Sequence, residues 1–214
     1  MNTKHFTTSS LVLAVLAAAA LAGTALAQSQ SSAPKMPNKD YVLTIDGTAT
    51  MVGKWACGGD ANVEAKPAAS AQPVPGLSEG VQTVTVTASV PGIECGDSTM
   101  NKHLRKALKM DEYPEIRYQA DKYTLVDNGS AVQTSGELTV AGVTKPVGLG
   151  AKLIPLPEGG TRVVGAVEIN MADFGVKPPS LFFGALKVAK VVTVKFDTVV
   201  RLPHEVTEAL FPKH

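Results

Sequence analysis

The stretch VQTVTVTASV, residues 81–90, decides the class of fold to which this chain belongs. Its apolar residues Val84, Val86 and Ala88 alternate with threonine and serine residues. Successive side chains of a β-strand point to opposite faces, so this pattern predicts a strand with one dry face and one wet face. The dry face therefore contacts a packed core, another sheet or a bound molecule.

The N-terminus has the pattern of a secretory signal peptide. Lys4 precedes an apolar run at residues 11–22, and Ala25-Leu26-Ala27 resembles a cleavage site. The run is shorter than the roughly 20 residues that a membrane-spanning helix needs. We therefore expect residues 1–27 to be removed, the mature chain to begin at Gln28, and the protein to be periplasmic.

The charges of the chain are balanced, with 20 basic and 19 acidic residues. Lys4 is the only lysine or arginine before Gln28, so the mature chain would hold 19 residues of each sign. Such a chain creates no global field that would collect nucleic acid, and we expect no nucleic-acid partner. Removing 27 of 214 residues leaves 187, a length that suits one domain with a full core.

Two cysteines, Cys57 and Cys95, lie in the exported part of the chain. An oxidising compartment favours a disulfide between them. In the chain-entropy model, a bridge over 38 positions destabilises the unfolded state by about 4 kcal/mol. A free thiol pair and an isolated redox switch remain alternatives, although the C-x-x-C motif of redox enzymes is absent.

Strand patterns dominate the chain between a lead-in at residues 28–39, which is too polar to fold, and a tail at 204–214. Turn signals such as Asp127-Asn128-Gly129 separate the strand candidates. The candidates are residues 41–46, 49–57, 63–66, 81–90, 115–126, 131–141, 146–154, 161–170 and 187–202. Residues 67–80, PAASAQPVPGLSEG, have the composition of a loop.

One helix interrupts the strand pattern. Asp97 or Ser98 can cap its N-terminus, and Pro114 prevents its continuation. Apolar residues recur at helical spacing at Met100, Leu104 and Ala107 or Leu108, together with His103. Eight or nine short strands with hairpin-length connections favour an antiparallel sandwich or a closed barrel, and closure removes the exposed sheet edges.

Four motifs in the second half resemble the YceI-like family of exported, lipocalin-like barrels, several of which bind polyisoprenoid lipids or isoprenoid quinones. They are MNKHLRKALKMDEYPEIRY at 100–118, GELTVAGVTKPVGL at 136–149, INMADFG at 169–175 and VAKVVTVKFD at 188–197. The resemblance spans about residues 41–202. It implies an all-β fold, an antiparallel eight-stranded lipocalin-like barrel with one short α-helix between strands, over residues 40–203.

The first half departs from the commoner family opening, in which an Asp and a His-Ser pair precede the first long strand. GTATMVGKWAC at residues 47–57 takes that place. Cys57 and Cys95 fit a variant branch that carries a Trp-x-Cys and a second cysteine before the helix. Ligand contacts made by the usual opening therefore do not transfer to this chain.

Side-chain volume decides whether an eight-stranded barrel fills its own centre or holds one small ligand. The expected inward faces are mostly valine, alanine and glycine, which leave room for an elongated apolar guest. The ligand-contact residues that we predict are Val84, Val86, Leu138, Val140, Leu149, Val167, Ile169, Phe174, Phe182 and Phe183. A solid core remains the alternative, since valine is common in any strand, and the resemblance favours the cavity.

The stretch DFGVKPPSLFFGAL, residues 173–186, gathers Phe174, Phe182 and Phe183 in a connection that contains proline and glycine. Such a segment builds either an entrance gate to a cavity or a loop that packs on the end of the barrel. Both interpretations stay open.

The predicted function is that of a periplasmic binding or carrier protein, not an enzyme, which holds a polyprenol, an isoprenoid quinone or a similar long apolar lipid. We expect no catalytic residues, no metal and no cofactor other than such a lipid, because no catalytic or nucleotide-binding motif is present and His103 lacks a metal-ligand partner. The alternatives are a solid-core periplasmic interaction module and an enzyme with its active site in the cavity.

Two further contacts are predicted for the surface. The helix carries a basic side of Lys102, Arg105, Lys106 and Lys109. This side is either simply solvated or touches an anionic membrane transiently while lipid is loaded. A homodimer is a further expectation.

Overall fold

The computed structural model of the protein describes residues 41–181 and 185–203 of the 214-residue chain. The chain divides into Met1–Gln30 and Ser31–His214, and every described residue belongs to the second part. The predicted signal peptide at 1–27, lead-in at 28–39 and tail at 204–214 lie outside the described residues. Phe182 and Phe183 also lie outside them.

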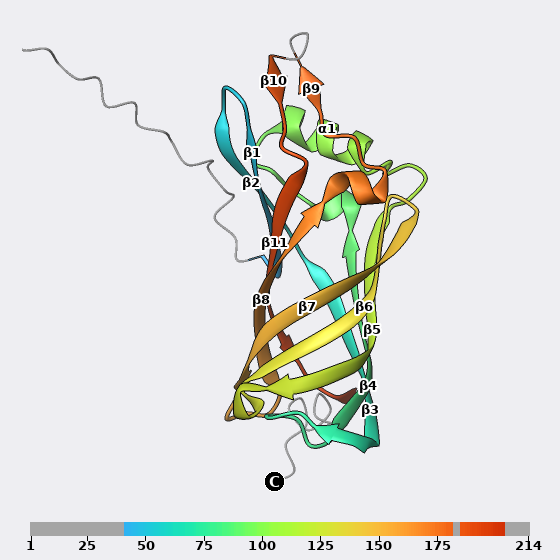
Figure 1. Cartoon of the computed structure of the whole chain (residues 1–214), viewed down its shortest axis with the longest axis vertical. Helices are drawn as coiled ribbons and strands as arrows, with labels where there is room; N and C mark the ends of the chain where they lie inside the picture. The colour runs from blue at the N-terminus through green and yellow to red at the C-terminus, as the bar shows by residue number, and fades with distance from the viewer. Residues whose placement is uncertain (1–40, 182–184, 204–214) are drawn as a thin grey trace, which may run out of the picture. The chain divides into compact units, whose positions relative to one another are not determined.

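Nine strands of the described chain form one sheet in the order β2-β1-β11-β8-β7-β6-β5-β4-β3 (Figure 1). All of its ladders are antiparallel. The strands are β1 (Leu43–Ala49), β2 (Gly53–Gly59), β3 (Ala61–Pro73), β4 (Gly80–Ser89), β5 (Glu115–Val126), β6 (Ala131–Val140), β7 (Val143–Pro155), β8 (Thr161–Asn170) and β11 (Val191–Val200). A separate hairpin joins β9 (Ser180–Leu181) to β10 (Leu186–Lys187).

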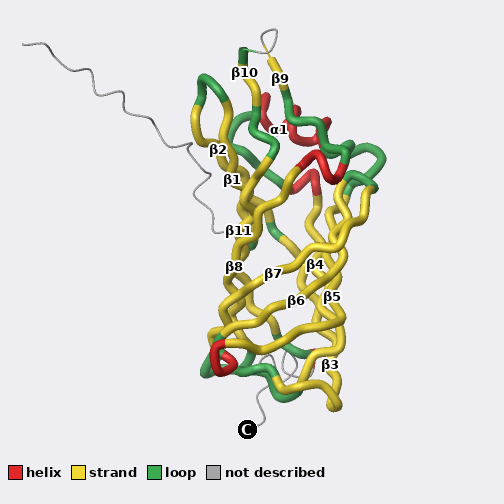
Figure 2. The backbone as a smooth tube through the Cα atoms, viewed as in Figure 1, coloured by secondary structure: helices red, strands yellow, loops and turns green. Residues whose placement is uncertain are grey.

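The sheet curls into a barrel-like tube, and its two edge strands are consecutive in the chain (Figure 2). Only Asp60 separates the end of β2 from the start of β3. β2 pairs with β1, whereas β3 pairs with β4, so one long extended segment closes the tube by its covalent path. The predicted antiparallel barrel is confirmed, but its sheet has nine strands rather than eight, because the chain leaves the ladder with β1 after Gly59 and joins the ladder with β4 at Ala61.

The loop predicted for residues 67–80 is wrong over its first half, because β3 continues to Pro73. The ladder between β3 and β4 shifts register after Lys66 and again after Ala68. Proline is tolerated in edge strands and at bulges, where its missing N–H leaves no ladder bond unmade. β3 is an edge strand, so the composition that indicates a loop also fits an irregular edge.

The helix α1 (Ser98–Ala107) begins at the predicted cap and lies at one end of the barrel (Figure 1). The Asp97 carboxylate accepts a hydrogen bond of 2.8 Å from the Met100 N–H. The predicted disulfide between Cys57 and Cys95 is confirmed, and it joins β2 to the segment before α1. Next to it, Gly58 and Glu94 exchange two backbone hydrogen bonds of 2.8 Å. This segment covers an edge of β2 and holds α1 in place.

The ladder between β7 and β8 is short, and this leaves a seam in the wall of the barrel. Pairing covers only Ala151–Pro155 of β7 and Thr161–Gly165 of β8. Above this ladder, the buried side chains of Phe174, in the short helix η3 (Met171–Phe174), and of Val176 join one apolar cluster with residues of both strands. Apolar packing therefore takes over from hydrogen bonding along the upper part of the wall.

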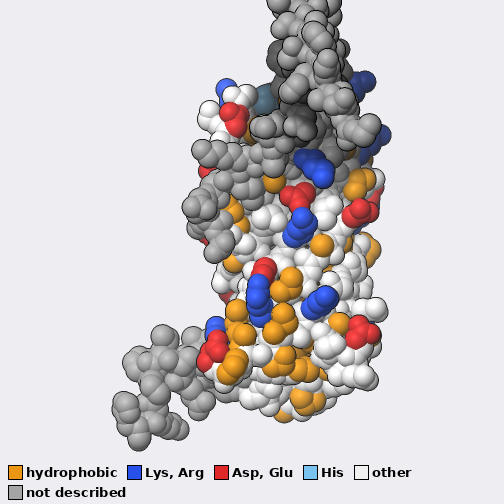
Figure 3. Space-filling model, turned by 90° about the vertical axis from the view of Figure 1, so that its left-hand side faces the viewer, with side chains coloured by type: hydrophobic (Ala, Val, Ile, Leu, Met, Phe, Trp, Pro, Cys, Tyr) orange, Lys and Arg blue, Asp and Glu red, His pale blue; other side chains and the backbone are white. Residues whose placement is uncertain are grey.

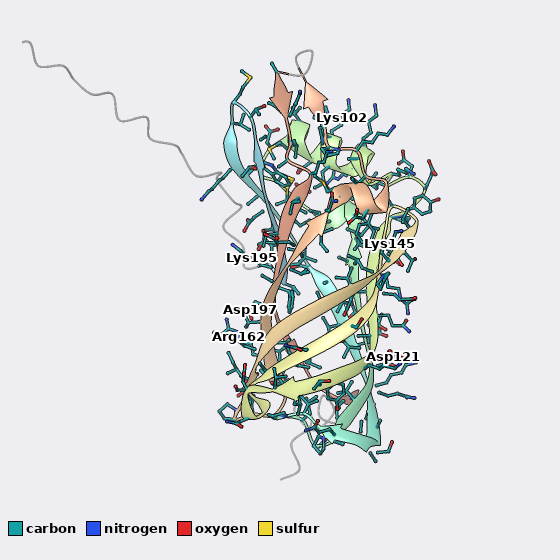
Figure 4. The ribbon with its side chains drawn as sticks, viewed as in Figure 1. Lys102, Asp121, Lys145, Arg162, Lys195 and Asp197 are labelled. Atoms are coloured by element: carbon teal, nitrogen blue, oxygen red, sulfur yellow. A yellow bond between two sulfur atoms is a disulfide. The ribbon has the colours of Figure 1, made fainter. Side chains whose placement is uncertain are left out.

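The outer surface of the barrel carries oppositely charged side chains next to one another (Figure 3). Arg162 on β8 donates from Nε to Asp197 Oδ1 on β11 over 2.7 Å, and Lys195 Nζ lies 2.6 Å from Asp46 Oδ2. Figure 4 labels Arg162 and Asp197 on this wall. Exposed ion pairs of this kind contribute little to stability, and they make the outside of the wall polar. Among the described residues, no helix combines the length and the apolar character that crossing a membrane requires.

Candidate functional site

The barrel encloses a cavity of about 650 Å³ whose lining is overwhelmingly apolar. Side chains of every strand of the nine-stranded sheet take part in this lining. Ligand pockets in proteins usually have volumes of roughly 300–1,000 Å³, and this cavity falls within that range. The dry face of residues 81–90 therefore looks into a lined cavity, and the interior is not the solid core that remained an alternative.

Eight of the ten predicted ligand-contact residues line this cavity. They are Val84, Val86, Leu138, Val140, Leu149, Val167, Ile169 and Phe174. The remaining two, Phe182 and Phe183, lie outside the described residues. The structure brings these residues together on the inner surface of β4, β6, β7, β8 and η3, and their contact with a ligand stays a prediction.

Aromatic side chains keep the middle of the barrel open by lying against glycines in the wall. A Cβ added at Gly47 would lie 2.2 Å from the Trp55 ring, and one added at Gly165 would lie 2.4 Å from the Phe196 ring. Each of these glycines is paired directly with the strand residue whose ring covers it. The glycines thus leave space beside the wall for bulky rings that would otherwise occupy the centre.

The Tyr118 ring lies in the same way over Gly136, where an added Cβ would come within 2.6 Å of Tyr118 Cζ. The Tyr118 hydroxyl donates to the carbonyl oxygen of Val147 over 3.3 Å, which ties β5 to β7 across the strand between them. Burial raises the pKa of the Tyr118 phenol above its usual value, and a hydrogen bond with the Thr134 side chain opposes this rise. The phenol therefore stays neutral, and its hydrogen bond holds β5 and β7 together in the wall.

The helix α1 and its C-cap residue supply cavity residues that are not among the predicted ligand contacts. Met100, Leu104 and the C-cap residue Leu108 line the cavity, and so do His103 and Ala107. Their spacing of three and four residues indicates the apolar face of a helix. The sequence offers no signal of what this face covers, because the packing of a helix on a barrel depends on contacts that are distant in the chain.

The helix α1, the β1–β2 turn and the β9–β10 hairpin lie at the same end of the barrel (Figure 1). We call this end the mouth of the cavity, because the lining residues Val52 and Lys54 are exposed there. Val52 in the β1–β2 turn lines the cavity although 60% of it is exposed. Pro179 and Leu186 line the cavity from the connection that was expected to form a gate or a packed loop. Phe174, from the same connection, is buried in the seam between β7 and β8 instead of standing at the mouth.

A buried apolar cluster forms the floor of the cavity at the opposite end of the barrel. Leu202 is fully buried there, in one cluster with Leu153, Val200 and Val74. The partly buried side chains of Tyr123 and Val132 pack against this cluster. The cavity therefore has a closed end and a mouth, as an elongated binding site requires.

Few polar groups face the cavity. The lining that the described residues form contains no carboxylate, and no three histidine, cysteine, aspartate or glutamate side chains of the described chain come together as metal ligands. Two buried polar atoms in lining residues, Trp55 Nε1 and Thr161 Oγ1, have no hydrogen-bond partner among the described residues. This arrangement suits the binding of an apolar molecule.

Comparison with known proteins places this geometry in a family. The model of the YceI-like domain family matches residues 29–200. The chain belongs to the YceI-like family. This YceI-like protein is 35% identical over 101 residues to Protein YceI of Shigella flexneri, a match that covers 44% of the chain and 52% of that relative. It is 33% identical over 101 residues to a UPF0312 protein of Pseudomonas aeruginosa, with the same coverage. The chain thus spans about half the length of the curated relatives that it matches.

Solved structures resemble the YceI-like protein in fold at low sequence identity. BcnA of Burkholderia cenocepacia superposes with a TM-score of 0.59 at 16% identity, covering 74% of this chain and 96% of that one. A polyisoprenoid-binding domain from Saccharophagus degradans superposes with a TM-score of 0.53 at 12% identity, covering 72% of this chain and 90% of that one. These similarities support the lipocalin-like architecture of the barrel.

Proposed function

We propose that this YceI-like protein is a periplasmic carrier that binds a polyprenol, an isoprenoid quinone or a similar long apolar lipid inside its barrel. The observation that carries the proposal is the cavity of about 650 Å³, which is apolar along its length, closed at one end and open at the other. The neighbour from Saccharophagus degradans, described as a polyisoprenoid-binding domain, supports an isoprenoid as the ligand.

The energetics of burial fit a flexible isoprenoid chain. Each five-carbon unit that leaves water contributes about 4 kcal/mol before costs are subtracted. Association and the ordering of the chain cost about 4–15 kcal/mol. Several buried units are therefore enough for binding in the micromolar range or tighter.

The apolar lining favours a ligand that is hydrocarbon over most of its length, which prenols and isoprenoid quinones both are. Because the described lining holds no carboxylate, we propose binding and transport instead of catalysis.

The location and the contacts of the carrier belong to the same proposal. The predicted signal peptide supports export to the periplasm, where a carrier would collect its lipid from one membrane and deliver it to another. A transient membrane contact is part of this function. The homodimer stays a prediction, which light scattering at micromolar concentration would check.

A cavity-filling variant tests the proposed function. Val86→Phe places an aromatic ring in the lumen. Thr85→Phe, on the same strand, adds the same ring at a position outside the cavity lining. An isoprenoid quinone with eight isoprene units is titrated into each protein, and binding is followed by the quenching of Trp55 fluorescence. We expect Val86→Phe to weaken binding at least tenfold and Thr85→Phe to bind as the wild type does. Equal affinity of all three proteins, or no binding by the wild type, would rule the carrier function out.

A further inference from the structure

The mouth of the barrel has a protruding apolar tip. Met51 and Val52, at the turn between β1 and β2, are 78% and 60% exposed, the largest exposures among the large apolar side chains of the described chain. Met51 has a φ of 72°, in the left-handed region where asparagine and glycine are the ordinary choices. A methionine in this conformation is strained and faces water. Neither feature helps a turn that only connects two strands.

The tip belongs to the rim of the cavity. Val52 and Lys54 line the cavity, so the turn stands where a ligand must pass. Two hydrogen bonds hold the turn in place. The Thr50 N–H donates to the Lys187 carbonyl oxygen over 3.0 Å, and the Lys187 N–H donates to Thr50 Oγ1 over 2.8 Å. The β1–β2 turn and the β9–β10 hairpin therefore form one body at the mouth.

Cations accompany this apolar tip. Lys54 and Lys187 flank it on the two hairpins, and Lys102 and Lys106 are exposed on α1, one helical turn apart. Figure 4 labels Lys102 beside α1 at the same end of the barrel. No described carboxylate forms a salt bridge with any of these four lysines. Arg105 differs from them, because it pairs with Glu94 over 2.8 Å.

We propose that the mouth of the barrel docks on an anionic phospholipid bilayer, with Met51 and Val52 inserted among the headgroups and with Lys54, Lys187, Lys102 and Lys106 facing lipid phosphates. An exposed apolar patch with basic residues around it is the combination by which proteins bind to membrane surfaces. The inference rests on the proposed function and adds its partner surface. A lipid could then pass between bilayer and cavity without crossing water.

A second exposed apolar site allows a matched comparison. Ile154 and Val199 are 44% and 38% exposed on the outer wall, and each is paired with Arg162 of the strand between them. Arg162 is neutralised by Asp197, so this site lacks free positive charge. It lies on a flat sheet face of the barrel wall, not on a protruding turn. We therefore expect it to take no part in membrane docking.

Vesicle sedimentation with the full mature chain tests the proposal. Vesicles of phosphatidylcholine with 30% phosphatidylglycerol are compared with phosphatidylcholine alone. The tip variant is Met51→Asn, because asparagine suits the positive φ and Met51 does not line the cavity. We expect the tip variant to lose at least threefold in partitioning onto anionic vesicles, and Ile154→Ser with Val199→Ser to partition as the wild type does. Replacing Lys54 and Lys187 by glutamine lowers partitioning about fivefold per lysine on anionic vesicles.

Quinone binding in solution, measured by Trp55 fluorescence on the same variants, separates this proposal from the carrier function. We expect the tip variant to bind quinone as the wild type does, which also shows that its barrel is folded. If the wild type does not bind quinone, the carrier function is refuted, and the vesicle result still decides whether the mouth binds membranes. The docking proposal is overturned if the wild type binds no vesicles, if the tip variant binds them as well as the wild type, or if only the Ile154 and Val199 variant loses binding.

Discussion

The two ends of the barrel are built from the same kinds of residues, and they do different things. At the closed end, Leu202, Leu153 and Val200 bury their side chains in one cluster, and Leu153 and Val200 form the floor of the cavity. At the mouth, residues of α1 and of the β1–β2 turn surround an opening, and Val52 faces water and cavity together. Apolar composition alone therefore does not distinguish a core from a binding site. The difference lies in whether the opposing wall comes close enough to fill the space.

The first test compares the free energies of unfolding of two variants in which a leucine is shortened to alanine. Leu202→Ala at the closed end removes a fully buried side chain, so we expect it to lower the free energy of unfolding by about 2–5 kcal/mol. Leu138→Ala only enlarges a cavity that already exists, and we expect a loss below about 2 kcal/mol, the lower limit for buried leucines, in the ligand-free protein. Urea unfolding of both variants gives the comparison. Equal losses would mean that the space around Leu138 is packed as a core.

The second test removes the disulfide near the mouth of the barrel. Cys57→Ser with Cys95→Ser removes the bond that holds the segment before α1 against β2, and we expect it to destabilise the protein by about 2–4 kcal/mol. Guanidinium unfolding of the wild type with and without dithiothreitol provides the control, because reduction must reproduce the loss. An unchanged unfolding midpoint under reducing conditions would contradict the structural role of this bond.

The smallest expected effect concerns the wall between the two ends. The pKa of Tyr118 is raised in the folded protein, mainly by burial, so the stability that its neutral form contributes is present below the unfolded pKa near 10 and is lost as pH rises through the folded pKa. Tyr118→Phe should remove this alkaline decrease in melting temperature between pH 9 and 11. Tyr113→Phe, at an exposed tyrosine, should retain it. The idea fails if both variants follow the wild-type pH profile.

The sequence predicted the strands and the inner face well, and the reason is local. Alternation of apolar and polar residues places Val84, Val86 and Val167 on the inner side whatever the rest of the barrel does, and all three line the cavity. The sequence also predicts a cap at Asp97 or Ser98, because capping needs only the next three residues, and the structure identifies Asp97. The loop predicted at residues 67–73 is wrong, since a loop and an irregular edge strand have the same composition.

The amino-acid sequence is enough to predict the period of each strand, the pairing of the two cysteines and the small residues of the inner face. The packing of distant strands is needed to show that glycines such as Gly47 and Gly165 accept the rings of Trp55 and Phe196 against the wall, which leaves the centre empty. It is also needed to show that α1 lines the mouth and that Phe174 fills a seam. The cause is the separation of the interacting residues along the chain. Alternation and capping depend on neighbours in the sequence, whereas a cavity depends on the distance between strands that are far apart in the sequence.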